Sequence, residues 1–202
     1  MIPVALAAVF FASIAFIATW ASGIVCANVV PAEDGPAPGK APYAILIVAS
    51  GTLGGVLVAM GAQPLQLGVS AIVAFAMVAC WCSDAQCGIV PDLFTLPALA
   101  VLLFFSFAQR DWGMVASAAI TFVPFAGAAL FSRGYGMGWG DAKLVALTGA
   151  ALGAPLAALA LAVACAAAVA VHRFSKLRRT PIAFAPYIAA FTGIALPLGL
   201  VR

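Results

Sequence analysis

The sequence predicts an all-α protein, a polytopic membrane bundle of about eight transmembrane helices. Of its 202 residues, 66% are hydrophobic and only 7% are charged, against roughly 25% charged residues in an average soluble domain. The mean hydropathy is +1.19, and apolar stretches near the roughly 20 residues that cross a bilayer recur almost end to end. Because these stretches lack the period-2 alternation of a membrane β-barrel, their backbones must form hydrogen bonds within helices.

Short polar or Pro/Gly-containing breaks separate seven full helices and one short helix. The first span has no Lys or Arg before Lys40, so it is expected to persist as a helix rather than act as a cleavable signal. A connector at about 30–41 is too short and too rich in Pro, Gly and Ala to fold alone, so 1–202 is interpreted as a single membrane domain. The expected spans are 4–29, 42–60, 64–83, 93–109, 112–132, 141–153 (the short one), 154–173 and 182–201.

The distribution of basic residues predicts the orientation. With eight spans, Arg110 and Arg202 lie on one side and the other seven basic residues on the opposite side, which marks the richer side as cytoplasmic. Both termini then face outward. This topology accounts for the net charge of +3 without a nucleic-acid partner, and the loop RFSKLRR (173–179) is suited to contact anionic lipid headgroups. The cytoplasmic set is Lys40, Arg133, Lys143, Arg173, Lys176, Arg178 and Arg179.

Two acidic residues stand out because they share the cytoplasmic face. Asp84 lies at the end of the third span, and Asp141 lies at the start of the short sixth span. Ionisable groups at such depth are costly, so they favour a functional role. The alternative is that both mark helix ends, with Asp141 as an N-cap. The acids in the connector and at the outer face are interpreted as solvated: Glu33, Asp34 and Asp111.

Residues that flank these two acids strengthen the functional interpretation. Gly138 and Gly140 in GWGD allow the chain to approach another helix or a substrate backbone closely. After Asp84, the tripeptide 90–92 (VPD) places Pro91 at a position suited to a turn or to the first residue of a helix.

Together these segments resemble the membrane-embedded GxGD aspartyl peptidases, and most closely the type IV prepilin leader peptidases of bacteria. Asp84 is followed by Val90-Pro91-Asp92 where that family has an Ile-Pro-Asn-like tripeptide. The signature Gly-x-Gly-Asp-x-Lys-Leu is intact as GWGDAKL (138–144), and TPIAFAPYIAA (180–190), which contains Pro186, is similar to the Pro-Phe-Gly-Pro stretch that opens the last helix of the family. The three matches occur in the family order over roughly the last 130 residues.

The resemblance implies an aspartic endopeptidase of the bacterial inner membrane, which cleaves the N-terminal leader of a prepilin or pseudopilin on the cytoplasmic side without a metal or cofactor. Asp84 and Asp141 would form the catalytic pair. The sequence departs from the family in having AQCG after Asp84, where basic residues are usual, and Asp92 in place of Asn. The connector lacks the paired CxxC motifs associated with N-methylation, so a peptidase without methyltransferase activity is predicted, similar to the short enzymes of tight-adherence or Flp-type pili.

Peptide hydrolysis by two carboxylates requires a base that draws a proton from water and an acid that protonates the carbonyl oxygen and later the leaving amine. Two acids within hydrogen-bond reach cannot both ionise cheaply, so they share one proton. Lys143 is interpreted as a headgroup anchor, with influence on the pair or contact with an acidic substrate residue as alternatives. Asp92 is interpreted as a helix cap rather than a third catalytic acid, and Pro186 as a residue that starts or bends a helix.

Two other interpretations remain open at this point. A proton- or ion-coupled transporter would use Asp84 and Asp141 as relay carboxylates, but such acids are expected near the middle of the membrane or between inverted repeats. An assembly scaffold with a decayed site would have lost one acid. Cys80, Cys82 and Cys87 cluster near a helix end, yet a second pair at zinc-binding spacing is missing and His172 is expected in a distant loop, so no metal site is predicted.

Overall fold

The computed structural model describes residues 2–29, 42–132, 137–174 and 183–199. Within these ranges the chain forms eight helices and no strand, which confirms the predicted all-α class. The connector at 30–41, Arg133 and most of the loop RFSKLRR lie outside the described residues. The helices are α1 (Ile2–Val29), α2 (Tyr43–Ala59), α3 (Pro64–Cys87), α4 (Asp92–Gln109), α5 (Trp112–Phe131), α6 (Trp139–Leu152), α7 (Ala154–Phe174) and α8 (Ala185–Gly199).

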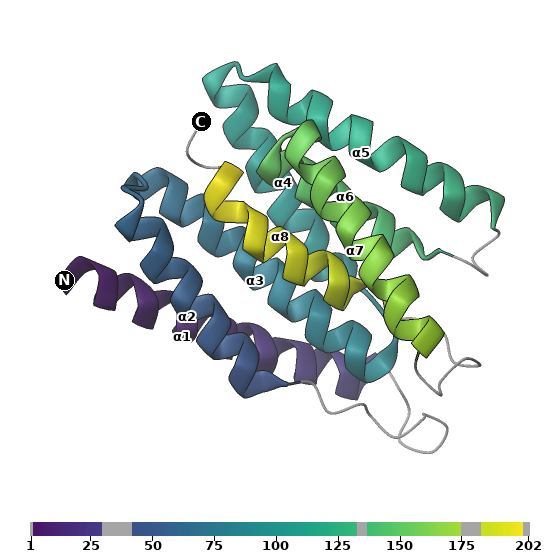
Figure 1. The fold of residues 1–202 in the computed structure, drawn as a ribbon, viewed down its shortest axis with the longest axis horizontal. Coiled ribbons are helices and arrows are strands. Elements are labelled where there is room, and N and C mark those ends of the chain that lie inside the picture. Colours follow the sequence, from purple (N-terminus) through teal and green to yellow (C-terminus); the bar gives the residue numbers. More distant parts are fainter. Residues whose placement is uncertain (1, 30–41, 133–136, 175–182, 200–202) are drawn as a thin grey trace.

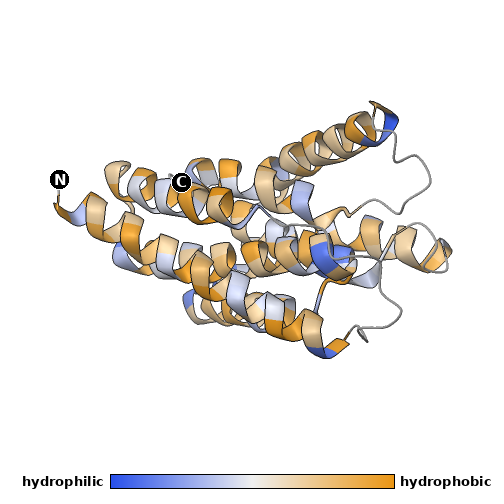
Figure 2. Cartoon of the chain, turned by 90° about the horizontal axis from the view of Figure 1, so that it is seen from below, coloured by the Kyte–Doolittle hydropathy of each residue, from blue (hydrophilic) through white to orange (hydrophobic). Residues whose placement is uncertain are grey.

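The helices form a bundle around α3, α6 and α8. The pair α1 and α2 packs against α3 on one side, and α5 packs against α6 on the other. Figure 1 shows α8 between these two groups, and α8 contacts α3, α6 and α7. The start of α1 and the end of α8 lie at the same end of the bundle (Figures 1 and 2), as an even number of crossings requires.

Apolar side chains cover the outside of the bundle, as expected for a protein surrounded by lipid. Within the described part of the chain, five helices are long and apolar enough to cross a membrane, namely α1, α3, α4, α5 and α7. Large side chains on them are exposed, such as Phe104 and Phe131, and Figure 2 shows hydrophobic residues along the outer surfaces. The helices α2 and α8 are apolar but shorter, with 17 and 15 residues. This is a multi-pass membrane protein.

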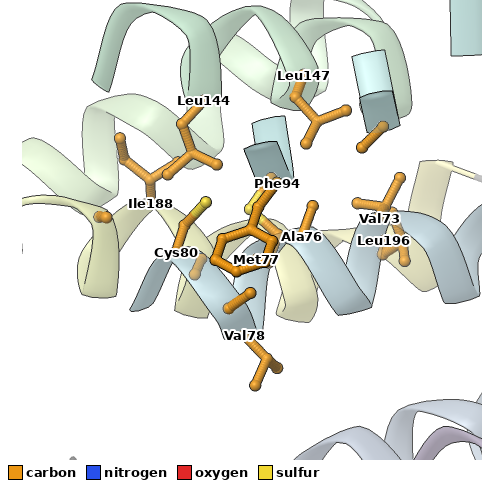
Figure 3. Close-up of a cluster of buried hydrophobic side chains, with 14 of the residues drawn as sticks. Val73, Ala76, Met77, Val78, Cys80, Phe94, Leu144, Leu147, Ile188 and Leu196 are labelled. Atoms are coloured by element: carbon orange, nitrogen blue, oxygen red, sulfur yellow. The ribbon is translucent and has the colours of Figure 1, made fainter. Parts of the chain in front are cut away.

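The buried core lies where α3, α4, α6 and α8 meet. Figure 3 shows Met77 of α3, Phe94 of α4, Leu144 of α6 and Ile188 of α8 in one cluster. Most residues of α6 are buried, although this helix has only 14 residues. At a rise of 1.5 Å per residue it is about 21 Å long, less than the roughly 30 Å hydrocarbon core of a bilayer. The short sixth helix of the sequence prediction is therefore a central element enclosed by its neighbours.

Small residues allow the helices to approach closely, as they often do in membranes. A Cβ atom at Gly149 of α6 would lie 2.6 Å from the carbonyl oxygen of Ser117 in α5. The hydroxyl of Thr121 in α5 donates to the carbonyl of Val145 in α6 at 3.3 Å. The hydroxyls of Thr148 and Thr192 join α6 to α8 at 3.1 Å.

Candidate active site

Asp84 lies in the last turn of α3. The sequence predicts that this helix ends at residue 83, just before Asp84. The helix continues to Cys87 and stops at Gly88, whose φ of 66° lies in the left-handed region that glycine adopts at no steric cost. As a result, Asp84 is directed into the bundle, and only 8% of its surface is exposed.

The start of α8 supplies hydrogen-bond donors to Asp84. Its Oδ2 atom accepts from the backbone N–H of Ala185 at 2.9 Å, and the N–H of Phe184 also bonds to the carboxylate. Backbone N–H groups at the start of a helix have no partner within the helix and favour a negative charge. Pro186 is the second residue of α8, a position where its missing N–H costs nothing. The predicted role of Pro186 at a helix start therefore agrees with the structure.

Asp141 lies in the first turn of α6, two residues after the helix begins. The N-cap is Gly138, so the alternative in which Asp141 caps the helix from the N-cap position is wrong. Instead, its carboxylate lies back over the start of the helix, where a Cβ atom added at Gly138 would be 3.3 Å from Oδ2 of Asp141. The free backbone N–H groups at a helix start favour a negative charge there.

The two carboxylates lie within electrostatic range of one another, and so does the buried thiol of Cys80, one turn before Asp84. The helices α3 and α6 are in direct contact. The structure thus brings together, at one end of the bundle, two acids that lie 57 positions apart in the sequence.

The segment between α3 and α4 packs against the start of α6 at Gly140. A Cβ atom at this position would lie 2.7 Å from the Cβ of Val90 and 2.9 Å from its carbonyl oxygen. Such distances are too short for any side chain, and backbone cannot move aside as easily as a side-chain tip. Gly140 is therefore required for close approach, as the sequence predicts, and this contact places Asp141 beside the segment that follows Asp84.

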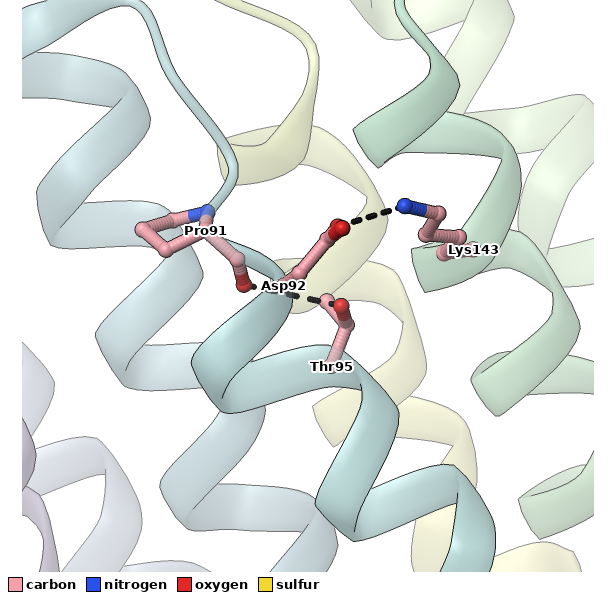
Figure 4. Close-up of polar contacts among 4 residues, drawn as sticks. All are labelled: Pro91, Asp92, Thr95 and Lys143. Atoms are coloured by element: carbon pink, nitrogen blue, oxygen red, sulfur yellow. Dashed lines mark hydrogen bonds and ion pairs between the residues drawn. The ribbon is translucent and has the colours of Figure 1, made fainter.

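A second contact at the same place joins Asp92 to Lys143. The Nζ atom of Lys143 lies 2.6 Å from Oδ1 of Asp92, as Figure 4 shows. Asp92 is the first residue of α4 and Pro91 is its N-cap, so the predicted cap role of Asp92 is wrong. The hydroxyl of Thr95 donates to the carbonyl of Pro91 at 3.5 Å. The ion pair and the contact at Gly140 together hold α6 against the tripeptide 90–92.

The cysteines near this site are free thiols within the described ranges. Cys80 and Cys82 are buried, and Cys87 donates to the carbonyl oxygen of Ser83 at 3.0 Å. His172 lies in the last turn of α7 rather than in a loop. Among the residues that the structure describes, no three His, Cys, Asp or Glu side chains are grouped in a way that could hold a metal ion.

Sequence reasoning missed the backbone donors at Phe184 and Ala185. Their contact with Asp84 spans 101 positions, and a backbone N–H leaves no mark in the residue type. The one local signal is Pro186, because a proline in the first turn of a helix indicates where free N–H groups are concentrated.

Comparison with known proteins gives a match to a protein family. A family model described as the Type IV leader peptidase family matches residues 70–172, a range that contains Asp84, the tripeptide 90–92 and the GWGDAKL segment. Neither a curated protein nor a solved structure gives a significant match.

Proposed function

Because the chain belongs to the type IV leader peptidase family, we propose that it is an aspartic endopeptidase that removes the N-terminal leader from a type IV prepilin or pseudopilin. Asp84 and Asp141 are its catalytic pair. The observation that carries this proposal is their convergence: α3 and α6 bring the buried carboxylate of Asp84 and the half-buried carboxylate of Asp141 within electrostatic range at one end of the bundle.

The pair supplies the proton transfers that hydrolysis of a peptide bond needs. The ionised carboxylate takes a proton from a water molecule as the water oxygen bonds to the peptide carbonyl carbon. The protonated carboxyl gives its proton to the carbonyl oxygen. When the tetrahedral intermediate collapses, the C–N bond breaks and the leaving nitrogen takes a proton from the first acid. Either aspartate can fill either role.

The starts of two helices hold the two acids in position for this chemistry. The start of α8 donates to Asp84, and Asp141 belongs to the first turn of α6 and lies close to Gly138. The carboxylates are therefore oriented by rigid elements. Orientation of reacting groups before the reaction contributes strongly to enzymatic rate.

We place the active site on the cytoplasmic face of the bacterial inner membrane. Lys143 and Arg173 lie at helix ends on the side of the two acids, whereas Arg110 lies at the opposite end of α4. Basic residues favour the cytoplasmic side. A substrate with a cytoplasmic leader and a membrane helix would present its scissile bond at this depth. The connector sequence contains no cysteine, which supports a peptidase without N-methyltransferase activity.

The transporter alternative is less well supported. Relay acids are expected near the bilayer midplane between discontinuous helices, whereas Asp84 and Asp141 occupy the last turn of α3 and the first turn of α6.

The test uses Asp84→Asn and Asp141→Asn variants, each co-expressed with a prepilin. Leader cleavage is measured by the change in electrophoretic mobility of the prepilin. Each variant should lower cleavage at least about 100-fold, the lower range for loss of a general acid or base. Asp111→Asn is the matched control, because this acid caps α5 at the other end of α4, where its side chain accepts from the N–H of Gly113. Full cleavage by either active-site variant, in protein inserted at normal levels, would refute the catalytic pair.

A further inference from the structure

An apolar groove lies between α2, α3 and α8, and on α3 it ends one turn before Asp84. Its volume is about 390 Å³. Residues on all three helices line it, including Leu53 of α2, Met77 and Trp81 of α3, and Gly193 and Leu196 of α8. The catalytic mechanism uses none of these side chains.

The groove is continuous with the catalytic end of the bundle. Along α3 its lining begins at Trp81, one turn before Asp84, and along α8 it begins at Ala189, one turn after Ala185. These are the two helices whose residues meet in the hydrogen bond from Ala185 to Asp84. On α8 the lining extends from Ala189 to Pro197, about 12 Å at a rise of 1.5 Å per residue. The groove therefore descends into the membrane from the level of the aspartates.

The chemistry of the lining selects an apolar occupant. The lining contains no charged residue, and its only hydroxyl groups are those of Ser50, Thr52 and Thr192. Thr52 already bonds to the carbonyl of Ala49, and Thr192 bonds to the hydroxyl of Thr148. At the rim, Ile194 is 70% exposed. A charged leader has no favourable contact here because an unpaired charge in lipid is costly.

The shape of the α8 wall favours a helix as that occupant. Ala189, Ala190 and Gly193 present small side chains to the groove, and a Cβ atom added at Gly193 would meet nothing within 4 Å. Small residues on a membrane helix permit another helix to pack closely against it. A groove that runs parallel to α3 and α8 for about 12 Å, roughly two helical turns, matches a helix laid along them.

We propose that this groove binds the apolar membrane helix of the substrate, the segment that follows the scissile bond. This inference rests on the proposed leader-peptidase function. A helix seated along α8 would start at the level of Ala185, so the peptide bond just before it would lie at the aspartates. The groove then selects substrates by their membrane helix, and the catalytic pair acts on whichever bond that helix presents.

Photo-crosslinking tests the occupant directly. The photoreactive residue p-benzoylphenylalanine is placed at Ile194 in the groove, and at Ile120 of α5 as a control that is 61% exposed on another face. Both variants carry Asp141→Asn, so that co-expressed prepilin remains uncleaved. We expect a prepilin adduct at position 194, mapped to the apolar helix, and none at 120. Adducts with lipid alone at 194, or equal prepilin adducts at both positions, would overturn the proposal.

A groove-filling variant gives an independent readout. Gly193→Trp should raise KM for prepilin at least about 10-fold with a smaller change in kcat. Gly127→Trp on α5 is the matched control, because a Cβ atom there also meets nothing within 4 Å. Unchanged KM in Gly193→Trp would contradict the proposal. If the parent protein fails to cleave prepilin, the proposed function itself fails; if it cleaves but neither groove result appears, only this inference fails.

Discussion

The two ends of the α4 helix show how differently one protein uses aspartate. At one end, Asp111 caps α5, bonds to Gly113 two residues away and is exposed to solvent. At the other end, Asp84 accepts from the N–H of Ala185 in α8, Asp92 pairs with Lys143 of α6, and Asp141 lies within electrostatic range of Asp84. An acid that is satisfied locally serves only its own helix. Acids whose partners come from remote segments define a site. Substitutions at each end of α4 test this contrast.

Gly140→Ala should give the largest effect among changes that leave the acids intact. Its Cβ atom would lie 2.9 Å from the Val90 carbonyl oxygen, so the start of α6 must shift and carry Asp141 with it. A displacement of about 1 Å at a catalytic group can lower the rate about 100-fold. The measurement is kcat/KM for leader cleavage.

Gly113→Ala provides the control at the other end. Its Cβ atom would also meet an atom at 2.9 Å, but that atom is Oδ1 of Asp111, the movable tip of a side chain. Cleavage should therefore remain within about twofold of the parent, since a side-chain rotation relieves such a contact. Equal losses in the two alanine variants would mean that the contact at Gly140 has no special role.

Ala185→Pro should lower cleavage about 10-fold or more by removing one donor to Asp84. A hydrogen bond to a charged group contributes about 1.5–3 kcal/mol, which corresponds to roughly 10- to 100-fold in rate if it is lost in the transition state. Ala185→Gly retains the N–H and should keep most of the activity. Similar kcat values for the proline and glycine variants would show that this donor does not matter.

Exchange of the charges of Asp92 and Lys143 should have a smaller effect. The side chains are 56% and 26% exposed, and exposed ion pairs contribute about 0–1 kcal/mol, or up to about fivefold in rate. Asp92→Lys and Lys143→Asp should each lower cleavage by about this factor, while the double exchange should restore most of it. Additive losses in the double variant would exclude the ion pair as the cause.

Asp111→Ala should have the smallest effect on activity. Loss of an N-cap costs about 0.5–2 kcal/mol of stability, and this cap lies at the far end of α4 from the aspartate pair. We expect a lower thermal midpoint in detergent with an unchanged kcat for the folded protein. If kcat fell as much as in Ala185→Pro, Asp111 would have to contribute to the active site, contrary to this prediction.

The sequence predicts most of the fold because the lengths of apolar runs determine where membrane helices form. All eight helices lie within a few residues of the expected spans. The largest difference occurs at the site: α3 is expected to end at 83 because hydropathy falls at Asp84, yet the chain remains helical until Gly88. The start of α6 at Trp139 likewise precedes the expected 141.

The contacts of the candidate site were only partly accessible from the sequence. Asp84, Asp141 and Gly140 could be selected from their residue types and flanks. The pairing of Asp92 with Lys143 and the donors at Ala185 depend on how α4, α6 and α8 pack. Such tertiary contacts join residues 51 and 101 positions apart, and no local pattern encodes them.

The most direct test of the account is whether Asp84 and Asp141 act as one catalytic unit. Leader cleavage is measured with purified Asp84→Asn, Asp141→Asn and the double variant. The effects of substitutions at residues that act together are strongly non-additive. The cleavage rate of the double variant should therefore be no more than about threefold below that of the less active single variant. Losses that multiply in the double variant would show two independent contributions and contradict a shared catalytic pair.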